Sequence, residues 1–459
     1  MYYSAIVHLS DLEFGPNNRA MQESVVEQVQ DPIKKMAGDL VRDIEECVIR
    51  KYDIQRERIG LVITGDIAHS GDGAEYDRAA EFINHIRDLL KNRNVPIAIV
   101  PGNHDVNWGE CERAFELIKK GSDYKEDILR EQMRSHPAKL RCFSEFFEAV
   151  LKQPYTPQKA FYFSTFKDLN IALVGIDTTL PCLFSEEDNY GLVREEQIQG
   201  AADAIRSIMK GNPEVVSMVA MHHCLQPDTD AAGESRLRYA TKTALLIKHH
   251  KFRTVLCGHE HTFRRLGGLG KDWSIITAGA FGLSHEYLSR RHREGTRPET
   301  NRYCILLIGD KRQKVLYRRL NRMDRPISLG YWEPDRTDGL DDEEEVLISP
   351  TPDEPVKVDL GLFAEPKKLL RYGTAMRYVS DSDPGQEILI QGVRLSDAHF
   401  PFRMIKSVTY KTETEVRLGD PDCSYQANLC LTNPSRDNLE VIIELETNQT
   451  VTLRSVIPS

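Results

Sequence analysis

Side chains that can bind metal ions follow several apolar runs in the first 262 residues of this chain. Each stands where a short run rich in Val, Ile and Leu ends, often next to a glycine. Imidazole and carboxylate ligands together suit Mn, Fe or Zn, whereas sites built only from oxygen suit Mg or Ca. A carboxylate can also bridge two ions, and a neutral asparagine oxygen adds a ligand without adding charge. The residues are Asp11, Glu13, Asp66, Asn103, His104, His222, His259 and His261.

A pair of such ions can catalyse phosphoryl displacement. Two divalent ions about 3.5–4 Å apart bind both the attacking and the leaving oxygen. They also lower the pKa of bound water, so that a hydroxide becomes available near neutral pH. Taken alone, Asp11 and Glu13 in "HLSDLEFG" could equally be a proton-transfer pair or ordinary turn residues. The later strand ends favour a metal site around Asp11.

The apolar runs that carry these residues are short and dense in Val, Ile and Leu, as expected of strands covered on both faces. Amphipathic stretches such as 75–92 lie between them, with apolar residues at three- and four-residue spacing. This alternation predicts a layered α/β domain. Ligands bind at the carboxyl ends of strands in such domains, so residues far apart in sequence can converge there. The runs are "YSAIVHLS", "IGLVITGD", "VPIAIVPGN", "LNIALVGID", "VVSMVAMHH", "TVLCGHEH", "WSIITAGA" and "YCILLIG".

The chain divides into three parts by composition. The α/β alternation covers residues 1–322 and is interrupted at about 108–160 by a charged helical insertion. Residues 323–360 combine prolines with an acidic run, which predicts that most of this range is a linker or an extended segment, although "LGYWEP" could dock on a domain. Residues 361–459 change to alternating strands separated by turns. This pattern favours an all-β, immunoglobulin-like sandwich.

The net charge of −10 does not exclude a polyanionic partner. Residues 338–354 hold eight acids and no base, whereas residues 290–325 hold twelve Lys and Arg against four Asp and Glu. No run of 18 apolar residues is present, and the N-terminal "MYYSAIVHLSD" lacks the basic region of a signal peptide. The nine cysteines are scattered without a CxxC, which is typical of free thiols. We therefore expect a cytoplasmic protein without membrane contact.

The motifs "SDLEFG", "GDIAHSGDGAEYDRAAEFI", "VPGNHD", "MHH" and "GHEH", in this order, resemble the calcineurin-like metallophosphoesterases. The resemblance covers about residues 1–320. It implies a four-layer α-β-β-α sandwich of two mixed sheets that hydrolyses phosphoric esters with two divalent metal ions. Mn is the favoured ion, with Fe, Zn or Mg as alternatives.

The resemblance also implies a role for each motif residue. Asp66 would bridge the two ions, and Asp11 and His261 would complete the first site. His104 would contact the substrate phosphate and protonate the leaving oxygen. The remaining ligands of the second site would be Asn103, His222 and His259.

Glu13 departs from the family pattern, which is Asp-x-His at this motif. Residues i and i+2 of a strand face the same side, so Glu13 can still point at the first ion. A carboxylate there would favour Mn²⁺ over Zn²⁺. Alternatively, Glu13 points away and the first site is weak. His69 and Asp72 could line the pocket or simply hold the turn.

The motif "GDIAHSG" lacks the Arg of "GDxxDRG" in the protein serine/threonine phosphatases, and "GNHD" differs from their "GNHE". These differences disfavour a protein phosphatase. The run "GDIAHSGDGAEYDRA" resembles the corresponding run in the branch of the family that hydrolyses phosphodiesters. We predict a phosphodiesterase that acts on nucleic acid, as a nuclease, or on nucleotides. Arginines after "GHEH" could contact further phosphates, or could pair with the acidic linker. They are Arg264, Arg265, Arg290, Arg291 and Arg293.

Two other functions stay open on the sequence. One is a docking or scaffold module with a modified metal site, which only Glu13 favours. The other is a phosphomonoesterase. The C-terminal β-domain carries no catalytic motif, so its expected role is to bind a protein partner or a second copy of the chain.

Overall fold

The structure is a computed structural model of the chain. The residues that it describes are 2–22, 30–121, 124–157, 159–185, 188–212, 214–225, 237–261, 264–266, 274–290, 300–309, 312–321, 331–336 and 343–347, together with eight strands within 370–456.

The first sheet is mixed and holds three of the strands that precede predicted ligands. Its strand order is β14-β13-β12-β1-β2-β3, with β15 also paired to β13. Strands β1, β2 and β3 are parallel, whereas β12 to β15 pair antiparallel. The carboxyl ends of β1 to β3 therefore share one edge. The bounds are β1 (Tyr2–Leu9), β2 (Ile59–Thr64), β3 (Ile97–Val100), β12 (Arg302–Gly309), β13 (Arg312–Asn321), β14 (Tyr331–Pro334) and β15 (Glu343–Leu347).

The second sheet has the order β10-β11-β9-β7-β5-β4. Its four inner strands are parallel, and its two outer strands pair antiparallel. All eight apolar runs predicted as strands lie in one of the two sheets. The bounds are β4 (Ala160–Tyr162), β5 (Ile171–Ile176), β7 (Val216–Ala220), β9 (Thr254–Cys257), β10 (Arg264–Leu266) and β11 (Ser274–Thr277).

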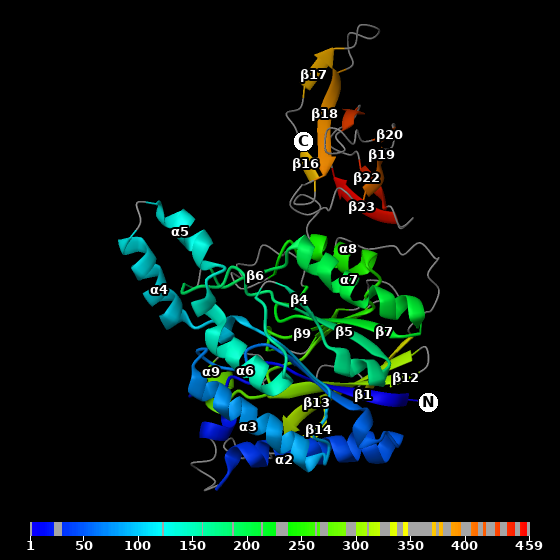
Figure 1. The fold of residues 1–459 in the computed structure, drawn as a ribbon. Coiled ribbons are helices and arrows are strands. Elements are labelled where there is room, and N and C mark those ends of the chain that lie inside the picture. The colour runs from blue at the N-terminus through cyan, green and yellow to red at the C-terminus, as the bar shows by residue number, and fades with distance from the viewer. Residues whose placement is uncertain are drawn as a thin grey trace.

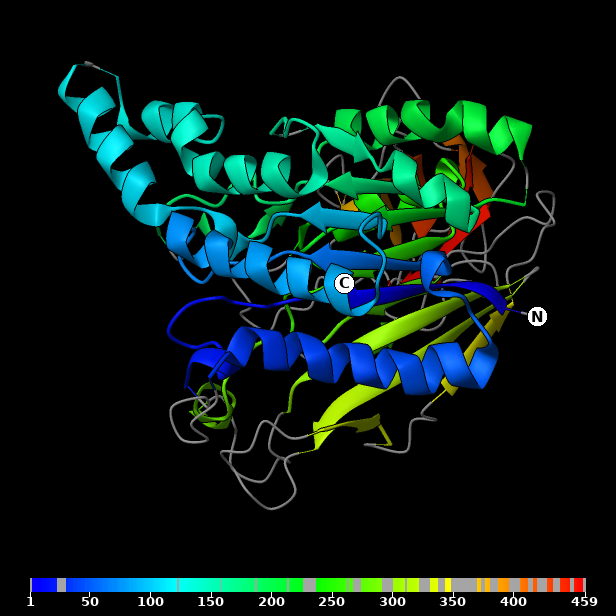
Figure 2. The same ribbon diagram turned by 60° about the horizontal axis from the view of Figure 1, so that its bottom comes forward.

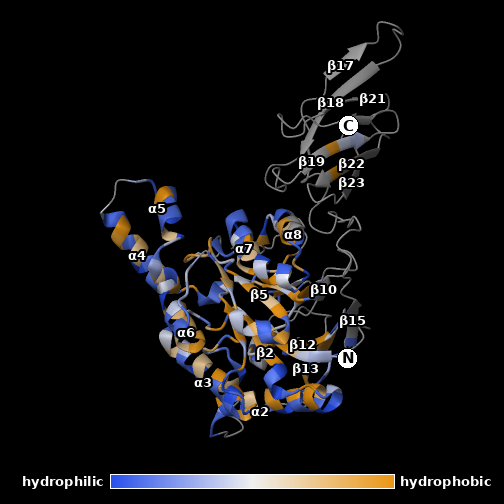
Figure 3. Cartoon of the chain, turned by 45° about the vertical axis from the view of Figure 1, so that its right-hand side comes forward, coloured by the Kyte–Doolittle hydropathy of each residue, from blue (hydrophilic) through white to orange (hydrophobic). Residues whose placement is uncertain are grey.

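Helices cover the outer faces of the sheets. Figure 1 shows α2 (Pro32–Ile44) and α3 (Gly73–Leu89) beside the first sheet, and α7 (Glu195–Gly211) and α8 (Ala240–His249) over the second. The strands β2, β3 and β5 are buried at every residue, and Figure 3 shows their hydrophobic character against the mixed colouring of the helices. One apolar core cluster contains side chains from both sheets. The layers therefore follow the order expected for the α/β domain.

Between β3 and β4 the chain forms α4 (Trp108–Lys120), α5 (Glu126–Met133) and α6 (Arg141–Leu151). Helix α6 packs on α3, where the rings of Phe146 and Tyr76 stack at 5.1 Å. Helices α4 and α5 project away from the sheets (Figures 1 and 2). This is the segment in which a helical insertion is predicted. A further helix, α9 (His285–Arg290), precedes β12.

The prediction that residues 323–360 are a linker is wrong for two segments. Strands β14 and β15 lie in this range and pair with β13, so the first sheet continues to Leu347. Ion pairs join the segments to the sheet, from Lys314 Nζ to Glu343 Oε2 at 3.1 Å and from Arg319 Nη2 to Glu333 Oε1 at 2.7 Å. Backbone pairing to a sheet edge depends little on composition, so the acidic character concealed it. "LGYWEP", expected to dock, contains β14.

Of the predicted β-domain at 361–459, the structure describes eight strands. They form one sheet of β16, β17, β18 and β21 and another of β19, β20, β22 and β23. The strand content agrees with an all-β domain, and its immunoglobulin-like arrangement stays a prediction. The bounds are β16 (Leu370–Tyr372), β17 (Met376–Val379), β18 (Glu387–Leu395), β19 (Ile405–Lys411), β20 (Val416–Leu418), β21 (Ala427–Leu431), β22 (Asn438–Leu445) and β23 (Thr450–Val456).

In the described parts of the chain, every helix is too short or too polar to cross a bilayer.

Candidate metal centre

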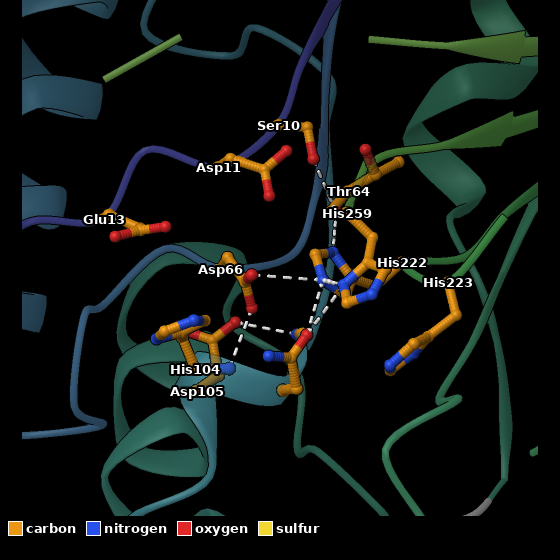
Figure 4. A network of polar contacts seen from close by, with 12 residues as sticks. Ser10, Asp11, Glu13, Thr64, Asp66, His104, Asp105, His222, His223 and His259 are labelled. Carbon is orange, nitrogen blue, oxygen red and sulfur yellow. Dashed lines mark hydrogen bonds and ion pairs between the residues drawn. The ribbon is translucent and has the colours of Figure 1, made fainter. Parts of the chain in front are cut away.

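The carboxyl ends of five strands from the two sheets meet at one edge. Strands β1, β2, β3, β7 and β9 each end two to four residues before a predicted ligand. Backbone hydrogen bonds join the loops, from Asp11 N to Gly65 O at 3.1 Å and from Gly258 N to His222 O at 3.0 Å. Figure 4 shows side chains from these loops gathered around Asp66. Asp11, Glu13, Asp66, Asn103, His222 and His261 are buried, and His104 and His259 are half-buried.

The first group of ligand atoms belongs to Asp11, Asp66 and His261. These atoms all lie within 4.8 Å of one another. His261 Nε2 is 3.3 Å from Asp11 Oδ1. Two carboxylates and one imidazole at this separation can hold one divalent ion.

The second group consists of Asp66, His222 and His259, joined by Asn103. His222 Nε2 lies 3.1 Å from Asp66 Oδ2, and Asn103 Oδ1 lies 3.0 Å from nitrogens of both His222 and His259. His222 Nδ1–H donates to Thr64 O at 2.7 Å, which directs Nε2 at the group. Asp66 belongs to both groups and is the residue that can bridge two ions (Figure 4).

The carboxylates of the site lack the partners that buried charges need. Within the described residues, no backbone, hydroxyl, amide, lysine or arginine donor reaches either oxygen of Asp11, Oε1 of Glu13 or Oδ2 of Asp66. Only imidazole nitrogens face them, at 3.1 to 3.7 Å. A buried carboxylate without a counter-charge is strongly unfavourable, so three together fit a cationic group. The donor set of carboxylate, amide and imidazole suits divalent metal ions.

The electrostatics of the site point the same way. Burial lowers the pKa of His222, but the charge of Asp66 outweighs it and raises that pKa to about 9. Burial would raise the pKa of Asp66, and the surrounding imidazoles hold it well below the usual range. Burial and the neighbouring His222 lower the pKa of His259 to about 3. The position next to Asp66 therefore attracts positive charge, which a metal ion can supply by displacing a proton.

Five of the site residues have left-handed backbone conformations. Their φ angles are 52° for Asp11, 42° for Glu13, 51° for Asp66, 73° for His259 and 54° for His261. Non-glycine residues rarely adopt this region, and each instance costs about 1–3 kcal/mol. Such strain gathers where surrounding structure holds side chains for function. The sharp turns explain how ligands leave the strands and point back to a common centre.

Asp105 holds the loops of Asp66 and Asn103 together, a role that the sequence analysis did not assign. Its carboxylate accepts hydrogen bonds from Ile67 N at 3.1 Å, Gly102 N at 2.8 Å and Tyr76 Oη at 3.0 Å. Gly102 lies so close to Asp66 that a Cβ would collide with its carboxylate. The Asp of "GNHD" and the Tyr of "EY" are the sequence signals for this support.

We expect Asp105→Asn to destabilise the protein by about 2 kcal/mol or more, because the NH2 group that replaces one carboxylate oxygen would face a backbone N–H donor that then has no acceptor. Urea unfolding followed by circular dichroism measures the free energy of unfolding. Tyr76→Phe is the matched control. It removes one donor and should cost only about 1 kcal/mol. Equal stability of Asp105→Asn and wild type would contradict the supporting role.

Glu13 points into the site, but for a reason other than the one expected. Strand β1 ends at Leu9, so the alternation of a strand does not orient Glu13, and that argument was wrong. The left-handed turn and a hydrogen bond from Glu13 N to Asp66 O at 2.8 Å orient it instead. Its Oε1 lies 3.7 Å from His261 Nε2, and its Oε2 lies 3.1 Å from His69 Nδ1. Glu13 therefore borders the first group.

His104 and His69 lie side by side at the rim of the site. Their rings stack with centroids 5.4 Å apart. His104 Nδ1–H donates to His69 O at 2.9 Å, so Nε2 of His104 is the nitrogen left to act on a ligand. Burial lowers the pKa of His104, but the charges of Asp66 and Glu13 outweigh it and raise the pKa. The contacts of His69 agree with both predicted roles, because its side chain meets Glu13 at 3.1 Å and its backbone N–H donates to Glu75 Oε2 within the turn at 3.1 Å.

His223 and His8 lie beside the site without joining either group. His223 Nδ1 is 2.8 Å from Thr178 Oγ1, and His8 Nε2 is 2.9 Å from Thr64 Oγ1. Both are buried. The predicted ligands nearest to them in sequence are His222 and Asp11.

The predicted phosphate-binding arginines are mostly beyond the described part of the chain. Arg291 and Arg293 lie outside the described residues, and the side chains of Arg264, Arg265 and Arg290 are not described. Several other bases of 290–325 are neutralised within the fold. Arg302 pairs with Asp335 at 2.8 Å, and Arg318 pairs with Asp43. The local excess of positive charge is therefore smaller than the sequence indicates.

Comparison with known proteins places this site in a family. A family model described as calcineurin-like phosphoesterase matches residues 5–263, a span that contains both ligand groups and His104. The chain belongs to this family. The family usually binds two divalent metals and hydrolyses phosphoric esters, and the two ligand groups around Asp66 agree with that pattern. No curated protein matches the chain in sequence.

Several solved structures resemble the chain distantly. Vps29 from Chaetomium thermophilum is 8% identical with a TM-score of 0.31, and the match covers 76% of this chain and all of Vps29. GAP50, the anchor in the inner membrane complex of Plasmodium, is 12% identical with a TM-score of 0.33 and coverages of 72% and 88%. PhoD is 10% identical with a TM-score of 0.38 and coverages of 70% and 66%.

Proposed function

We propose that the protein is a dinuclear metal-dependent phosphodiesterase that hydrolyses nucleic acid or nucleotides. The observation that carries the proposal is the position of Asp66 in two adjoining groups of buried ligands. A shared carboxylate is the arrangement needed to hold two ions within a few ångströms of each other. The oxygens without donors on Asp11, Glu13 and Asp66 support the same conclusion.

Each group of residues has its own part in the proposed reaction. Asp11, Asp66 and His261 would hold one ion, with Glu13 beside them, and Asp66, Asn103, His222 and His259 would hold the other. When bound, the two ions supply Lewis acidity at the phosphoryl oxygens and an acidified water as nucleophile.

His104 acts as the general acid. Its Nδ1–H is held by His69 O, so the proton that it can give is the one on Nε2. Asp66 and Glu13 raise the pKa of His104 against the effect of burial, which favours the protonated form that a general acid needs. Transfer of this proton to the leaving oxygen completes the cleavage.

A diester substrate is favoured over a phosphoprotein by the sequence around Asp66. The stretch "GDIAHSG" has no Arg at the position where the protein phosphatase motif has one. Ser70 stands there, and its Oγ–H donates to Glu75 Oε2 at 3.0 Å. This contact supports a structural role for the position in this chain.

Hydrolysis by the Mn-loaded protein tests the proposal. We expect bis(p-nitrophenyl) phosphate to be cleaved faster than p-nitrophenyl phosphate, and activity on single-stranded oligonucleotides or cyclic nucleotides. Cleavage of an oligonucleotide should fall steeply between 50 and 200 mM salt, whereas a single cyclic nucleotide should respond weakly. Faster cleavage of the monoester would favour a phosphomonoesterase. Inactivity on every ester would favour a docking module.

The choice of Mn²⁺ and a cytoplasmic location belong to the proposal. Three carboxylates near the first ion favour an oxygen-tolerant cation over Zn²⁺. The seven cysteines whose side chains the structure describes are free thiols, which supports a reducing compartment.

A further inference from the structure

Glu13 and His69 stand at two motif positions where related proteins have other residues. The family's first motif has His where this chain has Glu13. The motif "GDxxDRG", which belongs to the protein serine/threonine phosphatases and not to the whole family, has Asp where "GDIAHSG" has His69. The two residues are 56 positions apart in sequence, so only the fold can relate the two positions.

The two side chains are in direct contact. His69 Nδ1 lies 3.1 Å from Glu13 Oε2. A carboxylate can only accept, so Nδ1–H of His69 is the donor. Glu13 is fully buried, whereas the side chain of His69 is 28% exposed. The pair therefore consists of a buried acid and an imidazole that reaches it from the rim of the site.

The contact leaves the other oxygen of Glu13 directed at the first ligand group. In the described part of the chain Oε1 has no hydrogen-bond donor, and it lies 3.7 Å from His261 Nε2. One oxygen is thus bound by His69 while the second faces the place where the first ion would sit. A single hydrogen bond of this kind fixes the plane of a carboxylate.

Both partners are themselves fixed by their surroundings. Glu13 N donates to Asp66 O at 2.8 Å, and His69 N donates to Glu75 Oε2 at 3.1 Å. The ring of His69 stacks on that of His104, whose Nδ1–H donates to His69 O at 2.9 Å. The loop of His69 is therefore built to hold its imidazole in one orientation.

We propose that Glu13 and His69 are a coupled acid–imidazole pair, in which Glu13 binds the first metal ion and His69 is the positioning residue that orients its carboxylate. This inference rests on the proposed function in requiring an ion at the first group. Partners that orient a ligand through its second polar atom change metal affinity by about 10–100-fold. Glu13 also places an anionic oxygen at the first site, which makes this site prefer Mn²⁺ to Zn²⁺ more than one with an imidazole there would.

A swap of the two residues tests the pair. The variants are Glu13→His, His69→Asp and the double variant, and calorimetric titration with Mn²⁺ and Zn²⁺ measures affinity at each site without any assay of activity. Each single variant should weaken Mn²⁺ binding at the first site by about 10–100-fold. The double variant restores an acid beside an imidazole, so its total affinity should return to within about threefold of wild type, with preference shifted toward Zn²⁺.

Two further variants of His69, one conservative and one not, separate a loss of positioning from a loss of folding. His69→Asn retains an N–H near the position of Nδ1 and should keep the affinity of the first site, whereas His69→Ala should lose about tenfold. The second site should bind Mn²⁺ equally well in His69→Asn and His69→Ala. His136→Ala is the control for loss of a half-buried imidazole away from the site, since His136 Nδ1 accepts a hydrogen bond from Ala138 N at 3.2 Å.

The outcomes separate this inference from the proposed function. Wild type could bind two ions while the losses of Mn²⁺ affinity in the two single variants add up in the double variant. That result would contradict the coupling of Glu13 and His69 but not the proposed phosphodiesterase function. Equal affinity of His69→Ala and wild type contradicts the pair in the same way. Wild type that takes up no ions contradicts the proposed function and the pair together.

Discussion

Asp66→Asn is expected to lower the rate of phosphodiester hydrolysis by at least about 10³-fold. The carboxylate belongs to both ligand groups, so its loss weakens both ions at once. Metal ions contribute several kcal/mol to such reactions, and each 1.36 kcal/mol corresponds to a factor of ten. The measurement is kcat/KM for bis(p-nitrophenyl) phosphate in saturating Mn²⁺.

The matched control for this change is Asp53→Asn. Asp53 also has a left-handed backbone, with φ of 56° against 51° for Asp66, but it is exposed. Asparagine tolerates this conformation, so both variants make the same chemical change on the same backbone geometry. Asp53→Asn should retain full activity. If Asp66→Asn were equally active, the shared ligand would be excluded from the reaction.

His104→Gln is expected to slow the cleavage of esters with poor leaving groups by about 10²–10⁴-fold, because its Nε2 proton no longer reaches the leaving oxygen. p-Nitrophenolate leaves without such help, so bis(p-nitrophenyl) phosphate should lose much less. The measurement is kcat/KM for this ester and for a dinucleotide, compared between the variant and wild type.

His85→Gln serves as the control, since His85 lies on α3 and contacts Asp31 and Glu81 instead of the site. It should leave both substrates unaffected. An equal loss on both substrates for His104→Gln would assign His104 to the binding of phosphate. No loss on either would remove it from the mechanism.

Much of the fold and the metal centre could be predicted from the sequence because both depend on local patterns. Short Val- and Ile-rich runs are strands wherever both faces are covered, and five of these runs lead directly into a predicted ligand. The placement of Asp11, Asp66, Asn103, His222 and His259 then follows from the rule that parallel strands share a carboxyl edge. That rule is independent of the loops between the strands.

Features that depend on contacts between distant segments could not be predicted. The pairing of β14 and β15 with β13 is decided by backbone hydrogen bonds at a sheet edge, on which acidic residues give no information. The contact of Glu13 with His69 requires the left-handed turn after β1, and glutamate is an unusual residue for that conformation. Strand alternation predicted the direction of Glu13 correctly but for the wrong reason.

The role of Asp105 illustrates the same limit. Its type and its place in "GNHD" fit a ligand as well as they fit a support. Only its hydrogen bonds to the backbone of Ile67 and Gly102 distinguish the two. A carboxylate that already accepts several hydrogen bonds has little capacity left for an ion, whereas Asp11 has both oxygens without a donor.

The most direct test of the central claim is the number of ions that the protein binds. Mn²⁺ titrated into metal-free protein, with calorimetry and elemental analysis of the dialysed complex, should give two ions per chain for wild type. Asp66→Asn should bind at most one under the same conditions, because both groups lose the shared carboxylate. One ion or none in wild type, or two ions in Asp66→Asn, would contradict the dinuclear centre.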